Sequence, residues 1–163
     1  MASFDVVSKV DMQTLDNAVN VAVKEITTRY DLKNSKTVVE LDKKAPAIRV
    51  ETDNEMSLRS IEDILVSRII KQGLDGRCID FSVEPEQAGT RLKKDLKVRQ
   101  GLDKEQQRKV LKIIKDNAPK VTAQMMDDQI RVTSKKIDEL QAVIAVLRRM
   151  VQEFPLQFVN MKS

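Results

Sequence analysis

The sequence of 163 residues contains no histidine and no tryptophan, and Cys78 is its only cysteine. The absence of histidine removes the side chain that most often serves as general base or transition-metal ligand. A lone cysteine excludes an internal disulfide, and a thiol within a predicted strand is typical of a buried, inert side chain. The phosphate-binding motifs G-x-x-x-x-G-K-[ST] and G-x-G-x-x-G are also absent. We therefore expect no catalytic residues, no metal site and no cofactor, and we predict that the protein is not an enzyme.

Aromatic residues are scarce, at 3% of the sequence. A sheet that recognises RNA bases normally stacks them on two or three exposed aromatic side chains. None of the aromatic residues lies in the hairpin predicted below for residues 120–134, and those in strands, Phe4, Phe81 and Phe158, fit a core. Any binding of nucleic acid should therefore be mostly electrostatic and show little base specificity.

No apolar run approaches the roughly 20 residues that a membrane-spanning helix needs. Asp5 and Asp11 interrupt the start of the sequence, which shows no basic-then-apolar signal pattern. Apolar residues make up 41% and charged residues 33% of the chain, which is typical of a folded globular protein. We expect a cytoplasmic protein with no membrane partner.

The formal net charge of +4 hides an asymmetry along the chain. Residues 89–163 contain 17 Lys and Arg against 9 Asp and Glu, whereas residues 1–88 contain 12 against 16. A basic half beside an acidic half indicates an anionic partner for the basic one, although lysines also serve only to keep a protein soluble.

The clearest structural pattern is a hairpin followed by a helix within residues 120–151. Apolar and polar residues alternate on both sides of a polar turn at Asp127 and Asp128, which predicts two strands with one solvent-facing side. From residue 135 apolar residues recur every three or four positions, which predicts a helix of about four turns. Before this hairpin a strand is predicted at residues 90–99 and a helix at 103–117, and a last short strand follows at 156–159. Residues 3–83 give the same order: a strand at 3–10, a helix to about residue 30, a hairpin at 37–51, a helix that ends near Gly73 and a strand at 77–83. Residues 84–89 resemble a linker between the two halves.

This order predicts an α+β protein of two tandem ferredoxin-like (βαββαβ) domains, residues 1–88 and 89–163. Each domain should be a four-stranded antiparallel sheet with two helices on one face. Each half is small for an independent core, so we expect the halves to share an interface.

Several distinctive segments resemble the bacterial YajQ family. They are SFDVVSKVD, NAVNVAVKEITTRYDLKNSK, VRQGLDKE and KVTAQMMDDQIRVTSKKIDELQAVIAVLR, in the family's order over nearly the whole chain. The resemblance implies two ferredoxin-like domains with exchanged C-terminal strands, so that residues 156–160 complete the first sheet and residues 78–83 the second. It also implies binding without catalysis of a purine nucleotide (GTP or ATP) or cyclic di-GMP, and of tRNA or other RNA.

The strongest signal for a binding site is a row of cations on the strand at residues 90–99. Four of them alternate with apolar residues, and the predicted hairpin and the start of the next helix add four more. The expected phosphate-binding set is Arg91, Lys93, Lys97, Arg99, Lys120, Arg131, Lys135 and Lys136. The alternative is a charged edge strand, because lysines protect sheet edges from mispairing. A further basic stripe, Lys104, Arg108, Lys112 and Lys115, suits a phosphate backbone or simply the solvated face of a helix.

Two functions fit these observations. The first is a nucleotide- or RNA-binding protein that uses a basic sheet face and the cleft between the halves. The second is a protein-interaction adaptor or regulator, whose partner binding a small nucleotide controls. The charge split favours the first, and a stoichiometric protein partner that survives high salt would favour the second.

Overall fold

The computed structural model describes residues 1–163, and the chain forms two compact units. Unit 1 contains residues 1–9 and 100–163, and unit 2 contains residues 10–99. The elements of unit 1 are β1 (Ala2–Val7), α3 (Lys104–Asn117), β7 (Thr122–Met126), β8 (Gln129–Ser134), α4 (Ile137–Met150) and β9 (Gln157–Lys162). The elements of unit 2 are α1 (Met12–Thr28), β2 (Val38–Asp42), β3 (Ala47–Thr52), α2 (Glu55–Lys71), a 3-10 turn (Gly76–Cys78), β4 (Ile79–Asp80), β5 (Glu86–Ala88) and β6 (Arg91–Val98).

Three of the four helices begin where the sequence supplies a side-chain cap, and α4 begins without one. Asp11 accepts hydrogen bonds from the backbone of Gln13 and Thr14 at the start of α1, and Asn54 caps α2 in the same way. Asp103 and Gln106 form a reciprocal capping box at the start of α3. The helix positions predicted from apolar spacing are therefore confirmed, with their ends fixed by local polar contacts.

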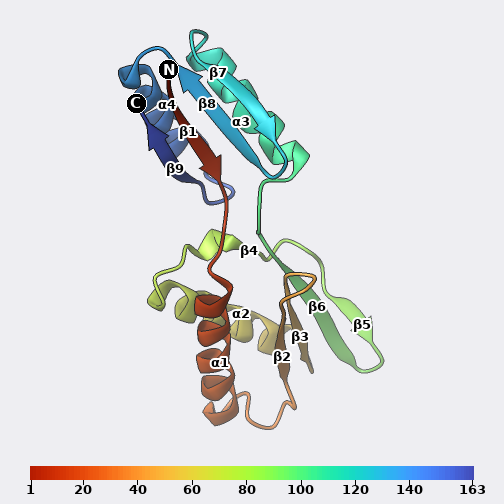
Figure 1. Ribbon diagram of the computed structural model, residues 1–163. Coiled ribbons are helices and arrows are strands. Elements are labelled where there is room, and N and C mark those ends of the chain that lie inside the picture. The colour runs from red at the N-terminus through yellow and green to blue at the C-terminus, as the bar shows by residue number, and fades with distance from the viewer. The chain divides into compact units, whose positions relative to one another are not determined.

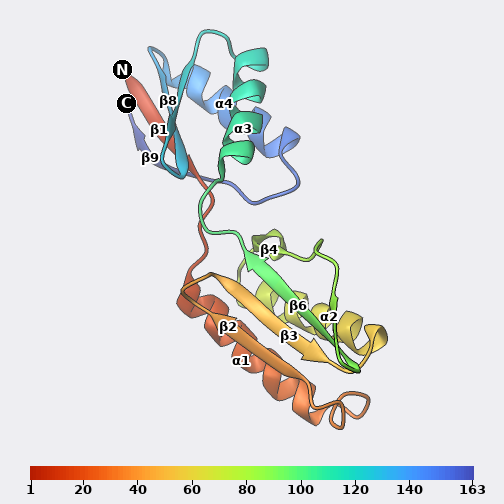
Figure 2. The same cartoon turned by 90° about the vertical axis from the view of Figure 1, so that its right-hand side faces the viewer.

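Each unit contains one antiparallel sheet with two helices on one face (Figures 1 and 2). The strand order is β7-β8-β1-β9 in unit 1 and β2-β3-β6-β4 in unit 2, where β5 pairs with β6. The core of unit 1 lies between its sheet and α3 and α4, and that of unit 2 lies between its sheet and α1 and α2. The α+β class is confirmed, and both sheets are compatible with ferredoxin-like units.

The sheets correct the predicted division at residues 88 and 89. β1 lies in the sheet of the β7–β8 hairpin, where Phe4 pairs with Val132, and β6 lies beside β3, where Leu96 pairs with Ile48. β9 does pair with β1, and β4 with β6. Strand β9 still lies in the same sheet as the β7–β8 hairpin that precedes it, and β4 lies in the same sheet as β2–β3. Relative to the predicted halves, the exchanged strands are therefore the first strand of each half, β1 and β6.

The predicted linker at residues 84–89 is wrong, because Glu86–Ala88 pairs with the start of β6. Gly89 makes the tight turn between these strands, with a φ of +65° that suits glycine. Strand β6 therefore has a full partner on one side and two short partners on the other, and its side chains face either the core or the opposite, open face of the sheet.

Candidate functional site

The side of the unit 1 sheet that faces away from α3 and α4 is polar, and we call it the open face of unit 1. On β8, Ile130 and Val132 are buried under the helices, while Arg131 between them points to the open face. On β1, Asp5 pairs with Arg131 and shares this face. The period-two alternation of the two strands produces this separation of apolar and polar side chains.

Asp5 is the centre of the open face. Its side chain is only 3% exposed, and its two oxygens accept hydrogen bonds from Arg131 Nε at 3.1 Å and from Asn160 Nδ2 at 2.9 Å. Asn160 reaches Asp5 from a bulge in β9, where it adopts a φ of +56°. Burial alone would raise the pKa of Asp5, but these hydrogen bonds and the nearby charges of Arg131 and Lys162 outweigh it and lower the pKa.

A hollow of about 320 Å³ opens beside this carboxylate. Its lining residues are Ser3, Asp5, Arg131, Asn160 and Lys162. The Nε of Arg131 is held by Asp5, so the guanidinium has a fixed direction, while the side chain remains 47% exposed. The hollow therefore combines a positioned guanidinium, an ammonium, a hydroxyl and an amide, a set that suits a phosphate and a polar ring.

Three further lysines lie at the same end of this sheet as Lys162. Ser3 pairs with Lys162, Ala2 with Ser134, and Thr122 with Thr133, so these strand ends coincide. The lysines that directly flank these ends, all exposed, are Lys120, Lys135 and Lys136. This end of the sheet, which we call the basic end, thus gathers four cations, of which Lys162 lines the hollow.

The N-terminus of α4 is already occupied by acidic side chains. Ser134 Oγ contacts Glu139 Oε2 and accepts a hydrogen bond from the backbone N–H of Lys136. Asp138 and Glu139 lie in the first turn, where they satisfy the helix dipole. An external anion at this end should therefore contact the side chains of Lys135 and Lys136 and not the helix terminus.

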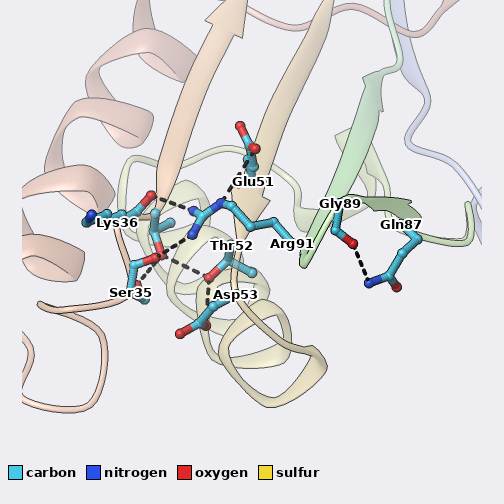
Figure 3. Close-up of polar contacts among 9 residues, drawn as sticks. Ser35, Lys36, Glu51, Thr52, Asp53, Gln87, Gly89 and Arg91 are labelled. Atoms are coloured by element: carbon cyan, nitrogen blue, oxygen red, sulfur yellow. Dashed lines mark hydrogen bonds and ion pairs between the residues drawn. The ribbon is translucent and has the colours of Figure 1, made fainter.

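The predicted cations of unit 2 have a different role. Arg91 donates hydrogen bonds to the carbonyl oxygens of Lys36 at 2.6 Å and Ser35 at 3.1 Å, and its Nε lies 3.5 Å from Glu51 (Figure 3). It therefore fastens the loop after α1 to the start of β6. Arg99 donates to the carbonyl oxygen of Arg77 and pairs with Asp80 at 3.9 Å. Both guanidinium groups stabilise the fold.

Lys93 and Lys97 are exposed on the open face of unit 2, but this face also carries acids. Glu51 on β3 and Glu86 on β5 are the cross-strand neighbours of Lys93 on β6. Asp95 lies between the two lysines and 3.5 Å from Arg49. Arg91, Lys93 and Lys97 share one face of β6 as predicted, whereas Arg99 lies beyond the end of the strand at Val98. The neighbouring hairpin is β2–β3 and not β7–β8, so the face is mixed in charge.

The structure thus divides the predicted site. Arg91, Lys93, Lys97 and Arg99 belong to unit 2, whereas Lys120, Arg131, Lys135 and Lys136 gather at one end of the unit 1 sheet. The alternation in the sequence did not identify Ser3, Asp5, Asn160 or Lys162 as neighbours of Arg131. The one available signal was Asp5 itself, an acid between the strand residues Phe4 and Val6.

The charge distribution follows the same division. Unit 1 contains 13 Lys and Arg against 9 Asp and Glu, and unit 2 contains 16 of each. The net charge of +4 therefore belongs to unit 1, because the exchange places acidic β2–β3 with basic β6.

The remaining reactive groups offer no second site. Cys78 is buried, and burial raises the pKa of its thiol to about 11, so it is protonated at neutral pH. No group of three or more Cys, Asp or Glu side chains is arranged to hold a metal ion. No helix is both long enough and apolar enough to cross a membrane.

The two sheets and the polar hollow define an α+β protein of paired sheet-and-helix units. The family model described as nucleotide-binding protein YajQ-like matches residues 2–162, and the chain belongs to this family. A relative from Cytophaga hutchinsonii named nucleotide-binding protein is 56% identical over 162 residues, which cover 99% of this chain and all of the relative. Relatives of the same name from Nitratidesulfovibrio vulgaris and Chloroherpeton thalassium are 47% and 44% identical, and these matches cover at least 97% of this chain and 96% of each relative.

Proposed function

We propose that this protein binds a nucleotide, without catalysing a reaction, in the hollow on the open face of unit 1. The observation that carries the proposal is the positioned guanidinium of Arg131 opposite the ammonium of Lys162, beside the buried carboxylate of Asp5. Arginine binds phosphate through its planar fork, and Asp5 holds that fork by one edge. The names of the relatives, which specify nucleotide binding, support the same conclusion.

The ligand class that we propose is a purine nucleotide, GTP or ATP, or cyclic di-GMP. The hollow of about 320 Å³ lies at the small end of the range for small-molecule sites, roughly 300–1,000 Å³. One phosphate can contact Arg131 and Lys162, and a second can reach the basic end formed with Lys120, Lys135 and Lys136. The hydroxyl of Ser3 and the amide of Asn160 remain to contact a ribose or base edge.

RNA is the second ligand that we propose for unit 1, on the exposed side of α3 and not on the open face of the sheet. Lys104, Arg108, Lys112 and Lys115 form an exposed stripe along α3 of the same positively charged unit. Such a stripe binds a phosphate backbone with a strong dependence on salt and little dependence on sequence. The absence of aromatic side chains from β7 and β8 fits this kind of binding.

The test is a titration of protein freed of nucleic acid with cyclic di-GMP, GTP, ATP and a tRNA pool. It is run at about 50 and 200 mM salt, a range over which binding through many phosphates weakens by orders of magnitude. Tight binding of one small nucleotide at both concentrations supports the hollow. Binding of tRNA alone, lost at the higher salt, contradicts a small-molecule site.

The location is tested with Arg131→Ala combined with Lys162→Ala. We expect nucleotide affinity to fall by about tenfold or more, because two charge-assisted contacts to phosphate are lost. The matched control is Lys93→Ala combined with Lys97→Ala, which removes the same charge from unit 2. Equal losses in the two double variants would place the site elsewhere.

A further inference from the structure

Strand β7 forms an unprotected edge of the unit 1 sheet. The sheet order places β7 at one end, with a single partner, β8. Alternate backbone N–H and C=O groups of an edge strand point away from its partner and are available to another chain. Proteins normally protect such edges with charged residues, bulges or very short strands.

The other edge strands of this protein have those protections. β2 contains Glu40 and Asp42, β4 and β5 span two and three residues, and β9 has a bulge and ends with Lys162. β7, with the sequence TAQMM, has no charged residue, proline or bulge over its five residues. Its Met125 is 40% exposed.

An apolar groove of about 510 Å³ runs beside this edge. Its lining comes from α3, from the loop that follows it and from β7, and comprises Leu111, Ile114, Lys115, Pro119, Val121, Thr122 and Ala123. Leu111, Val121 and Ala123 are only partly covered by the core of unit 1. Figure 2 shows α3 lying over one side of the sheet to which β7 belongs. A strand added at β7 would therefore place alternate side chains in this groove.

The charges around the groove indicate the sign of its occupant. Residues 106–126 contain one acid, Asp116, and several cations, of which Lys109 pairs with Glu153. The other cations of residues 106–126, all exposed, are Arg108, Lys112, Lys115 and Lys120. Lys115 belongs both to the groove and to the basic stripe, so the stripe borders the groove.

We propose that β7 and this groove bind an extended, acidic segment of another protein, which pairs with β7 and inserts apolar side chains between α3 and β7. An unpaired strand edge and an apolar groove suit a peptide, because a nucleic acid has neither a peptide backbone nor aliphatic side chains. A second copy of this chain would bring a like-charged stripe to the same groove. An acidic partner instead neutralises Lys112 and Lys115.

The direct test uses a fluorescein-labelled, end-blocked peptide of sequence EVEVEVE, with KVKVKVK as its matched control. Fluorescence anisotropy measures binding, and amide proton NMR identifies the contacted residues. We expect saturable binding of the acidic peptide only, with slowed hydrogen exchange at Ala123 and Met125. Contacts at β9, or equal binding of both peptides, would overturn the proposal.

The charge requirement is tested by Lys112→Glu combined with Lys115→Glu. We expect EVEVEVE to bind about tenfold more weakly and KVKVKVK to bind more tightly, because two attractions become repulsions. The gain for the basic peptide also shows that the variant is folded. The control, Lys24→Glu combined with Arg59→Glu, makes the same charge change on exposed helix positions of unit 2 and should leave both affinities unchanged.

Three other outcomes would contradict an acidic peptide partner. If the variant with Lys112→Glu and Lys115→Glu binds EVEVEVE as tightly as the wild type does, charge does not select the peptide that the groove binds. A concentration-dependent dimer in sedimentation, with β7 amides protected in the absence of peptide, assigns the edge to a second copy. Binding of tRNA at β7 without any peptide binding assigns it to nucleic acid.

Discussion

The two units use the same strand order for opposite purposes on their open faces. In unit 1, Arg131 is oriented by a buried Asp5 and lines a hollow together with Lys162. In unit 2, Arg91 and Arg99 donate to backbone carbonyl oxygens and pair with acids. The two arginines on the unit 2 sheet therefore stabilise the fold, whereas Arg131 of unit 1 remains available to a ligand.

The difference comes from which hairpin lies beside the central strand. Strand β6 is basic, and its neighbour β3 carries Glu51, while Glu40 and Asp42 lie on β2. Strand β1 has no cation, and its one acid, Asp5, is buried against Arg131 of β8. Fold and charge thus have to be considered together, because a basic strand becomes a basic surface only if its neighbours are neutral.

The largest effect is expected from Lys94→Ala in unit 2. Lys94 is buried, and its Nζ contacts Glu62 at 2.7 Å and the carbonyl oxygen of Phe81 at 2.8 Å. Removing one member of a buried ion pair should lower the free energy of unfolding by about 3 kcal/mol. Urea denaturation followed by circular dichroism measures this loss. Lys93→Ala, an exposed neighbour, should change stability by no more than about 0.5 kcal/mol.

Arg91→Ala should lower the free energy of unfolding by about 2 kcal/mol, because a charged donor to two carbonyl oxygens is lost. Arg91→Lys should restore only part of this, since lysine lacks the planar fork. Nucleotide affinity should not change in either variant. A weaker affinity with unchanged stability would mean that Arg91 contacts the ligand and that the comparison between the units is wrong.

The local structure was predictable from sequence because its causes are local. Apolar spacing located the four helices, and period-two alternation located both hairpins. The same alternation correctly placed Arg91, Lys93 and Lys97 on one face of β6. Lys94 departs from this alternation, because it lies on the apolar face of the strand, and its contact with Glu62 explains why a lysine is tolerated there.

The exchange of β1 and β6 was not predictable, because alternation defines a face but not a partner. Asp5 lies 126 residues from Arg131 and 155 residues from Asn160 along the chain. Nothing in the local pattern distinguishes β8 from β3 as the neighbour of β1. The candidate site depends on these distant pairings, so only part of it, Arg131 and the lysines of the basic end, was found from sequence.

A third prediction tests whether acids alone keep unit 2 from binding polyanions. Glu40→Gln, Glu51→Gln and Asp95→Asn together remove three of the acids that neighbour Arg49 and Lys93 and leave Glu86 in place. We expect this triple variant to bind a tRNA pool about tenfold more tightly at low salt, with a steeper dependence on salt. The matched control neutralises three acids on helices of the same unit, the partly buried Asp16 and the exposed Glu55 and Asp63, as Asp16→Asn, Glu55→Gln and Asp63→Asn. A similar gain in the control would mean that net charge, and not the sheet face, determines binding.

The smallest effect concerns the pH dependence of unit 1. The pKa of Asp5 is lower in the folded protein than its ordinary value near 4, so its ionised form stabilises the fold. This contribution is fully present above pH 4 and is lost as the pH falls through the lower, folded pKa. Asp5→Asn should therefore be less stable than wild type by about 1 kcal/mol at pH 7, and the difference should shrink at pH 3. Unfolding free energies of both proteins at the two pH values measure this. If the difference in unfolding free energy is the same at both pH values, the charge of Asp5 does not contribute to stability. An ion pair with Asp5 would then not hold Arg131 toward a phosphate.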